Sequence, residues 1–274
     1  MTTTIEPSPR GVAPDFPAFE TIDGDPRAGL ILICDHASNA LPAEYDSLGL
    51  PAREFQRHIA YDPGAAAVTR GLASRLGAPA VLSCFSRLLI DPNRGDDDPT
   101  LIMRLSDGAV VPGNATITPA ERAARIARYY APYHAAVADA IAGARASGVV
   151  PAIFSMHSFT PVWRGVARRW HAGVLWDKDP RLAVPLIAEL GADGALVVGD
   201  NEPYAGALRN DTLYRHATSA GLAHALLEVR QDLIADEAGV TARCDRLAAI
   251  LQRLNADPAL HEVRYWGSLA DEAR

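Results

Sequence analysis

The stretch Leu30-Ile31-Leu32-Ile33-Cys34, which leads directly into Asp35-His36, decides the fold class of this chain. A continuous apolar run of this length is too short for a helix and is typical of a strand that is buried on both faces. Comparable runs occur at residues 152–156 and 223–229, and segments with helical patterns lie between them. Alternating strands and helices predict an α/β fold, a three-layer αβα domain with a mixed, largely parallel central sheet.

Local end signals place several helices in this pattern. The sequence Asp62-Pro63-Gly64 indicates an N-cap and proline at the first helical position, and Gly77 ends the helix that follows. The sequence Thr118-Pro119-Ala120-Glu121 is a capping box, which predicts a long helix to about Ala146. Further elements are predicted as strands at residues 80–82, 88–90, 172–176 and 195–198 and as helices at residues 184–190 and 238–254.

The domain organisation follows from composition along the chain. Proline, glycine and acidic residues are frequent in the first 27 positions, and no internal repeat or low-complexity linker divides the rest. We therefore expect an irregular N-terminal arm at residues 1–27 and one catalytic α/β domain at residues 28–274. With 49% hydrophobic residues, a chain of 274 residues has enough apolar surface for a large core.

Charge and composition exclude several classes of function. The net charge is −7, and Lys178 is the only lysine, so arginine supplies the other 25 of the 26 basic residues. Enzymes that depend on a buried lysine and phosphate loops of the G-K-[ST] type are therefore excluded. An acidic chain also offers no electrostatic reason to bind nucleic acid or an anionic membrane.

The cellular setting is predicted from what the sequence lacks. No apolar run approaches the roughly 20 residues that span a bilayer, and the first residues do not have the form of a signal peptide. Three widely spaced cysteines form no C-x-x-C pair, which favours a reduced, cytoplasmic protein with the thiols in or near the core. The sequence does not indicate an oligomeric state.

The residues that could carry chemistry are histidines and carboxylates at strand ends, since G-x-G-x-x-G, Walker A and G-x-S-x-G motifs are absent. His36 and His157 each follow a predicted strand, and Glu228 lies near the end of a third. Parallel strands bring their carboxyl ends to one edge, where ligands bind in open α/β sheets. Two imidazoles and a carboxylate can hold a catalytic zinc ion, and a further carboxylate can act as general base.

Structural roles for the same residues remain open at this point. A histidine at a strand end is often only a hydrogen-bonded structural residue, and Asp62 is a good helix cap in its own right. Arg87, Asn93 and Arg94 suit the recognition of a carboxylate, but an ion pair with the acidic run at residues 96–98 is an equal alternative.

Six segments, in order along the chain, resemble the N-formylglutamate amidohydrolase family. They are Cys34-Asp35-His36-Ala37-Ser38-Asn39, His58-Ile59-Ala60-Tyr61-Asp62-Pro63-Gly64-Ala65, Ser86-Arg87-Leu88-Leu89-Ile90-Asp91-Pro92-Asn93-Arg94, Phe154-Ser155-Met156-His157-Ser158-Phe159, Gly199-Asp200-Asn201-Glu202-Pro203-Tyr204 and Leu227-Glu228-Val229-Arg230-Gln231-Asp232-Leu233-Ile234. Together they extend over roughly residues 29 to 255. The resemblance implies a phosphorylase/hydrolase-like fold similar to the zinc carboxypeptidases and aspartoacylases.

The resemblance also implies a metal-dependent hydrolysis that removes an acyl group from an acidic amino acid. His36, Asp62 and His157 are the implied ligands of a divalent metal, Zn²⁺ or alternatively Co²⁺, and Glu228 is the implied general base. In the zinc carboxypeptidases and aspartoacylases, an H-x-x-E motif supplies two metal ligands. Here Asn39 stands where the glutamate would be, and Asp62 is therefore assigned as the carboxylate ligand.

The remaining assigned residues fall into two groups. The expected substrate contacts are Arg87, Asn93, Arg94, Asn201, Tyr204 and Arg230, with Arg230 facing either the substrate or Asp232, and the expected outer partners of the ligands are Asp35, Ser38, Asn39 and Ser158. The resemblance implies a small-molecule N-acyl amino acid such as N-formyl-L-glutamate as substrate and a place in histidine degradation. The alternatives are another N-acyl amino acid, a short peptide with an acidic end, or a non-catalytic carboxylate-binding protein on the same fold.

Overall fold

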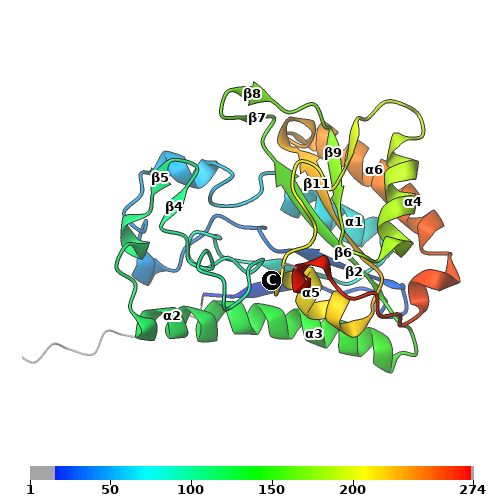
Figure 1. The fold of residues 1–274 in the computed structure, drawn as a ribbon, viewed down its shortest axis with the longest axis horizontal. Helices are drawn as coiled ribbons and strands as arrows, with labels where there is room; N and C mark the ends of the chain where they lie inside the picture. The colour runs from blue at the N-terminus through cyan, green and yellow to red at the C-terminus, as the bar shows by residue number, and fades with distance from the viewer. Residues whose placement is uncertain (1–15, 273–274) are drawn as a thin grey trace, which may run out of the picture.

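A seven-stranded sheet forms the centre of the structure, a computed structural model that describes residues 16–272 (Figure 1). Its strands are β1 (Phe19–Ile22), β2 (Leu30–Cys34), β3 (Ala80–Ser83), β6 (Ala152–Phe159), β9 (Ala172–Leu175), β10 (Val198–Asp200) and β11 (His224–Arg230). The order across the sheet is β1-β3-β2-β6-β11-β9-β10. The four strands from β3 to β11 run parallel, whereas β1 and β9 pair antiparallel with their neighbours in that group. The predicted mixed, largely parallel sheet is therefore confirmed.

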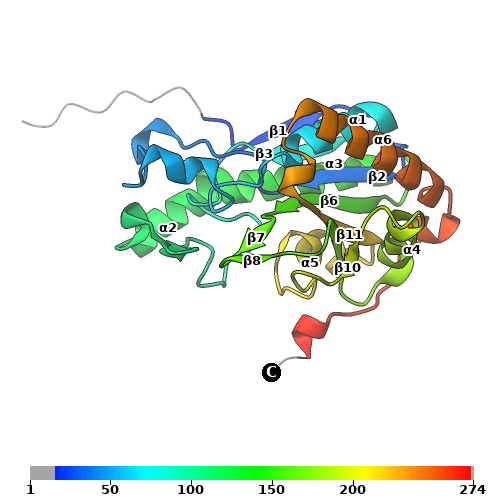
Figure 2. The same cartoon turned by 90° about the horizontal axis from the view of Figure 1, so that it is seen from above.

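Helices cover both faces of the sheet (Figures 1 and 2). One face carries α1 (Ala65–Leu76), α4 (Pro180–Gly191) and α6 (Glu237–Leu254), and the other carries α3 (Ala131–Ala146) and α5 (Thr212–His216), with α2 (Pro119–Arg125) joined to α3 by the π-helical segment Ile126–Tyr130. Short 3-10 helices lie at Ala43–Tyr45, Ala52–Gln56, Pro112–Asn114, Thr218–Ala220, Gln231–Leu233, Pro258–His261 and Leu269–Asp271. None of the helices in residues 16–272 combines the length and the apolar character that a bilayer crossing requires.

Strand β2 explains why the core has two halves. Leu30, Leu32 and Cys34 pack on the side of α1 and α6, whereas Ile31 and Ile33 pack on the side of α3. Since successive side chains of a strand point to opposite faces, an unbroken apolar run needs a hydrophobic layer on each side. The three free cysteines fit the sequence-based expectation, two of them buried and one partly buried.

One predicted strand is absent from the described residues, and one segment predicted to be irregular contains a strand. Within the expected irregular arm, residues 1–15 lie outside the described residues, but Phe19–Ile22 forms edge strand β1, paired with β3. The segment Leu88–Ile90 is apolar because it is a fully buried turn rather than a strand, and the Leu89 N–H donates to the Ser86 carbonyl. The predicted strand at 195–198 begins later, as β10.

Helix α1 begins differently from the prediction. Its N-cap is Gly64, with a φ of 83°, and Asp62 does not cap it with its side chain. The left-handed conformation that glycine permits turns the chain into the helix, so the Asp62 carboxylate is free to point elsewhere. Thr118 is confirmed as the N-cap of α2 by the hydrogen bond of 3.1 Å from the Glu121 N–H to its hydroxyl, whereas the Glu121 carboxylate accepts from Arg125 Nε at 2.9 Å.

Two small hairpins stand beyond the carboxyl end of the sheet. They are formed by β4 (Leu105–Ser106) with β5 (Ala109–Val110) and by β7 (Val162–Trp163) with β8 (Val166–Ala167). Residues from both hairpins line the cavity described next.

Candidate functional site

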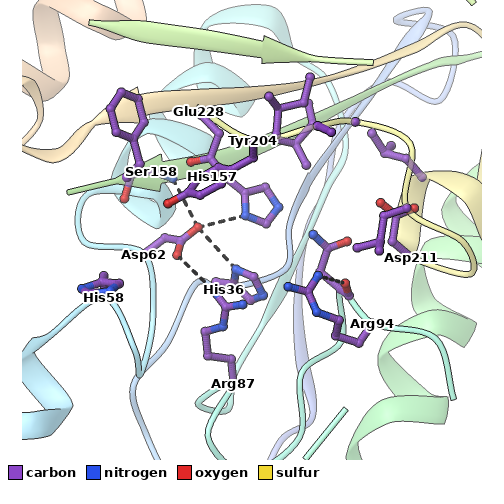
Figure 3. Close-up of a pocket in the computed structure, with 18 of the residues that line it drawn as sticks. His36, His58, Asp62, Arg87, Arg94, His157, Ser158, Tyr204, Asp211 and Glu228 are labelled. Carbon is purple, nitrogen blue, oxygen red and sulfur yellow. Dashed lines mark hydrogen bonds and ion pairs between the residues drawn. The ribbon is translucent and has the colours of Figure 1, made fainter. Parts of the chain in front are cut away.

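A cavity of about 450 Å³ opens at the carboxyl ends of the parallel strands (Figure 3). His36 follows β2, His157 lies in β6 and Glu228 lies in β11, directly opposite His157 in the strand register. All three side chains line the cavity. The sequence-based expectation that one sheet edge gathers them is confirmed.

Two imidazoles and one carboxylate form a buried cluster in this cavity. Nδ1 of His157 lies 2.9 Å and Nδ1 of His36 lies 3.4 Å from the same oxygen, Oδ2 of Asp62. One ligand atom from each residue falls within 4.8 Å of the others. This donor set fits a metal ion, because two histidines and a carboxylate are a common catalytic zinc triad. The cluster can therefore bind a metal ion.

The other ring nitrogen of each imidazole, Nε2, contacts a second carboxylate. Nε2 of His36 lies 2.8 Å from Oδ1 of Asp91, and Nε2 of His157 lies 3.1 Å from Oδ2 of Asp35. Carboxylates in this position fix the imidazole tautomer, so that Nδ1 is the free nitrogen that faces the cluster. The prediction placed Asp35 correctly but did not include Asp91, although Asp91 follows the apolar run at 88–90 as Asp35 follows β2.

The position of Asp35 is itself fixed by hydrogen bonds. Its Oδ1 accepts hydrogen bonds from Tyr133 Oη at 2.8 Å and from Thr212 Oγ1 at 2.7 Å. Ser158 supports the cluster from another side, since its backbone N–H donates to Asp62 Oδ2 at 3.2 Å. Ser158 is thus an outer partner as expected, through its main chain.

The electrostatics of the cluster favour a cation among its three side chains. Burial opposes the charged form of His157, but hydrogen bonds to Asp35 and Asp62 outweigh burial and hold its pKa well above the usual range. Burial likewise raises the pKa of Asp62, yet the two histidines hold it well below its usual range. A proton on His157 neutralises the cluster in the absence of metal, and a divalent ion would take its place.

Glu228 has the features of a general base. Its Oε2 is buried and has no hydrogen-bond partner among the described residues. Burial raises the pKa of Glu228 to about 7; the charge of His157 opposes this and that of Asp62 adds to it. A carboxyl group with a pKa near neutrality can accept and return a proton at little cost.

Two arginines reach the cavity and differ in how far their charge is already neutralised. Arg87 donates from Nε and Nη2 to Asp91 Oδ2, at 3.0 and 2.7 Å, and lies 3.9 Å from Asp62. Arg94 lines the cavity and makes no ion pair with any residue of the described range, while its Nη1 donates to the Asn93 carbonyl. The alternative of ion pairs with residues 96–98 is thus wrong for both arginines, and Arg94 is the cation available to a ligand.

Asn93 and Tyr204 also line the cavity, as predicted. Oδ1 of Asn93 accepts from the Thr212 N–H at 3.3 Å, which ties it to the start of α5. The hydroxyl of Tyr204 accepts a hydrogen bond of 2.9 Å from Arg168. Both side chains can contact a bound substrate.

One expected substrate contact, Asn201, was wrong, and for Arg230 the alternative of a pair with Asp232 is confirmed. Asn201 does not line the cavity; its Oδ1 accepts from the backbone N–H groups of Trp176 and Gly206, at 3.0 and 2.9 Å, and shapes the loop. Arg230 pairs with Asp232 at 2.7 Å and also points away from the cavity. Both residues share a segment with a residue that lines the cavity, Tyr204 or Glu228, but their own side chains stabilise the chain around it.

Two expected outer partners were also wrong. The Ser38 hydroxyl accepts from the Ala40 N–H at 3.1 Å, within its own turn. The Asn39 side chain donates to the Phe55 carbonyl at 2.7 Å. Neither side chain hydrogen-bonds to the cluster in the described part of the chain, and the carboxylate of the cluster is that of Asp62.

The comparisons with known proteins agree with this geometry. The family described as N-formylglutamate amidohydrolase matches residues 28–235. The chain belongs to this family. Membership in the N-formylglutamate amidohydrolase family makes the chain an amidohydrolase.

Solved structures place this amidohydrolase among similar folds. The gene product Atu2144 from Agrobacterium tumefaciens is 37% identical, with a TM-score of 0.81 over 86% of this chain and 94% of that one. An N-formylglutamate amidohydrolase from Ralstonia eutropha JMP134 is 23% identical and matches with a TM-score of 0.62 over 86% of this chain and 96% of that one, which shows the shared fold. Among curated proteins, no sequence matches this chain significantly.

Proposed function

We propose that this amidohydrolase cleaves the N-acyl amide of an acidic amino acid, such as N-formyl-L-glutamate, with a divalent metal held by His36, Asp62 and His157. The proposal rests on one observation above all. Two imidazole Nδ1 atoms converge on one carboxylate oxygen, beside a buried and unpartnered Glu228. The family assignment supports the reaction class.

Zn²⁺ is the proposed ion, with Co²⁺ as an alternative, because the donor set is the one that catalytic zinc favours. When bound, it would polarise the scissile carbonyl and make water more acidic. Asp35 and Asp91 contact the Nε2 atoms of the two imidazoles, which would leave both Nδ1 atoms to hold the ion.

Substrate binding is assigned to the side of the cavity that holds Arg94. Its guanidinium would take one substrate carboxylate, because planar N–H donors match a carboxylate in a bidentate way. The positive charge of Arg87 lies between Asp91 and the cluster, where it also favours an anionic ligand. Asn93 and Tyr204 complete the polar lining.

Glu228 carries the proton in the proposed reaction. Its carboxylate takes a proton from the attacking water and then donates it to the nitrogen of the departing amino acid. Water attacks the acyl carbon and the amide C–N bond breaks, so the products are a carboxylic acid, formate for a formyl substrate, and the free amino acid. The proposal further places this reaction in the cytoplasm, in histidine degradation or another route that forms an N-acyl amino acid.

A hydrolysis screen tests the proposal. N-formyl, N-acetyl and N-carbamoyl derivatives of Glu, Asp, Gln and His would be incubated with protein that has been stripped by a chelator and reloaded with Zn²⁺ or Co²⁺. We expect the release of formate and glutamate from N-formyl-L-glutamate, loss on chelation, and recovery with metal.

The screen also separates the alternatives. Preferred cleavage of an acetyl or carbamoyl compound would replace the formyl substrate but keep the chemistry. Absence of both metal uptake and hydrolysis would favour a carboxylate-binding protein and contradict the proposed enzyme. Glu228→Gln is the matched variant, because it preserves shape and removes the base.

A further inference from the structure

Asp211 is a buried carboxyl group of the cavity that the proposed reaction does not use. It lies just before α5, on the same side of the cavity as Arg94 (Figure 3). Only 5% of the residue is exposed. Its Oδ1 accepts the Tyr214 N–H at 2.7 Å, whereas Oδ2 has no hydrogen-bond partner within residues 16–272. One carboxyl oxygen is therefore available to a ligand.

The cavity that Asp211 lines also has an apolar part. Leu175, Leu213 and Leu226 line the same cavity and are nearly fully buried. Burial raises the pKa of Asp211 to about 7; the Tyr214 N–H opposes this shift. A carboxyl group among apolar residues changes its hydrogen-bonding character on ionisation, because the acid donates and the carboxylate only accepts.

The charged groups that act on Asp211 come from three other segments. Asp35, which follows β2, raises its pKa, whereas Arg94 and His157 lower it. None of these groups is within ion-pair distance of Asp211. The pKa of Asp211 is thus governed by burial first, by the hydrogen bond from the Tyr214 N–H second, and by these charges after that.

The charges in the cavity indicate a role for Asp211 in binding the substrate. An N-acyl glutamate brings two carboxylates, but Arg87 is already engaged by Asp91, which leaves Arg94 as the cation without an ion pair in the described residues. A second carboxylate in the cavity needs a hydrogen-bond donor, since a buried anion without a partner is strongly unfavourable. The protonated form of Asp211 can supply that donor.

We propose that Asp211 is a specificity-determining residue that contacts the side chain of the amino acid in the substrate. When protonated, it donates a hydrogen bond to an acidic side chain. When ionised, it repels an acidic side chain and accepts a hydrogen bond from a carboxamide. This inference rests on the proposed function and names the residue that selects among its substrates.

A purely structural role for Asp211, as the N-cap of α5, can be separated from this one. Asparagine caps a helix as well as aspartate does, so Asp211→Asn should preserve α5. The asparagine amide is a permanent donor at the same place, and it mimics the protonated acid at every pH. Asp236→Asn is the matched control, because Asp236 caps α6 outside the cavity.

The test compares two substrates in one enzyme. The ratio of kcat/KM for N-formyl-L-glutamate to that for N-formyl-L-glutamine would be measured from pH 6 to pH 9 with the metal-loaded protein. Titration of Glu228 affects both substrates equally and cancels in the ratio. We expect a constant ratio where Asp211 is protonated and a fall of up to about tenfold per pH unit above the pKa of Asp211. Asp211→Asn should give a flat ratio, and Asp236→Asn should follow the unmodified protein.

Each outcome has a distinct meaning. A flat ratio in the unmodified protein, or an unchanged slope in Asp211→Asn, overturns this inference while the proposed function stands. If metal-loaded protein hydrolyses none of the N-formyl, N-acetyl and N-carbamoyl compounds, the proposed function is overturned and this inference with it. A falling ratio that Asp211→Asn abolishes supports both.

Discussion

Nδ1 of His157 lies 2.9 Å from Oδ2 of Asp62, although 95 positions separate the two residues in the chain. Both side chains are buried, and the imidazole of His36 approaches the same oxygen from another direction. A lone pair on an imidazole Nδ1 and a lone pair on the Asp62 carboxylate repel each other at this distance unless a proton or a metal cation lies between them. A proton fills that place when no metal is bound, and so metal uptake and proton release are coupled.

We expect metal binding to release about one proton near pH 7, because the protonated His157 must become neutral to bind. Calorimetric titration of chelator-treated protein with Zn²⁺ in buffers of different ionisation enthalpy measures that number. His157→Ala should lose both metal and activity. His171→Gln, outside the cavity, is the control. Full metal content and full activity in His157→Ala would refute the ligand assignment.

Asp91→Asn should weaken metal binding by about 10- to 100-fold, because the amide no longer fixes the His36 tautomer as a carboxylate does. Asp35→Asn should act in the same way on His157. Competition with a fluorescent zinc chelator measures the affinity. Asp193→Asn, at an exposed ion pair with Arg246, serves as the control. Unchanged affinity in both variants would show that the outer carboxylates do not matter for the metal.

The activity of Glu228→Gln should fall by about 10²- to 10⁴-fold in kcat, since the amide cannot accept a proton. In the unmodified protein the base must be ionised, so kcat/KM should rise with pH. Burial places the pKa of Glu228 at about 7 in the metal-free protein, and His157 opposes that shift. A bound cation lowers it further, so the rise should be complete by about pH 7. If kcat/KM of Glu228→Gln still rises with pH in the same range, the rise belongs to the titration of another group.

The two arginines should differ when each is replaced by alanine. Arg94→Ala should raise KM by about 10- to 100-fold with little loss of stability, since its guanidinium makes no ion pair in the described residues. Arg87→Ala should also lower the melting temperature and the metal affinity, because Asp91 loses a buried partner. Steady-state kinetics and thermal unfolding distinguish the two patterns. Equal losses of stability in Arg94→Ala and Arg87→Ala would contradict the finding that, of the two arginines, only Arg87 forms a buried ion pair within the described residues.

Gly173→Ala should destabilise the protein by about 1 to 3 kcal/mol, because a Cβ at this position of β9 would overlap the backbone carbonyl of Glu202. The displaced loop carries Tyr204, so KM should rise as well. Gly143→Ala in α3 is the control: its Cβ meets nothing within 4 Å, and removing a mid-helix glycine should stabilise by about 0.5 to 1 kcal/mol. Urea unfolding measures both changes.

The local predictions that failed have a common physical cause. Apolar character at 88–90 reports burial, and a buried turn is as apolar as a buried strand. Asp62 before Pro63 and Gly64 has the sequence of a helix cap, but Gly64 takes that position and the carboxylate turns into the cavity. Polarity at an N-terminal stretch did not reveal β1, because an edge strand needs few apolar residues.

The sequence by itself determined the strand and helix alternation, the long helix opened by Thr118, and the gathering of His36, His157 and Glu228 at one sheet edge. These features follow from the periodicity of apolar residues, which each short segment contains, and from the general geometry of parallel strands. Only the tertiary structure decided that Asp91 and Asp35 orient the imidazoles, that Asn201 and Arg230 turn away from the cavity, and that Asp211 faces it. The direction of a loop side chain depends on partners far away in the chain, and no local pattern contains them.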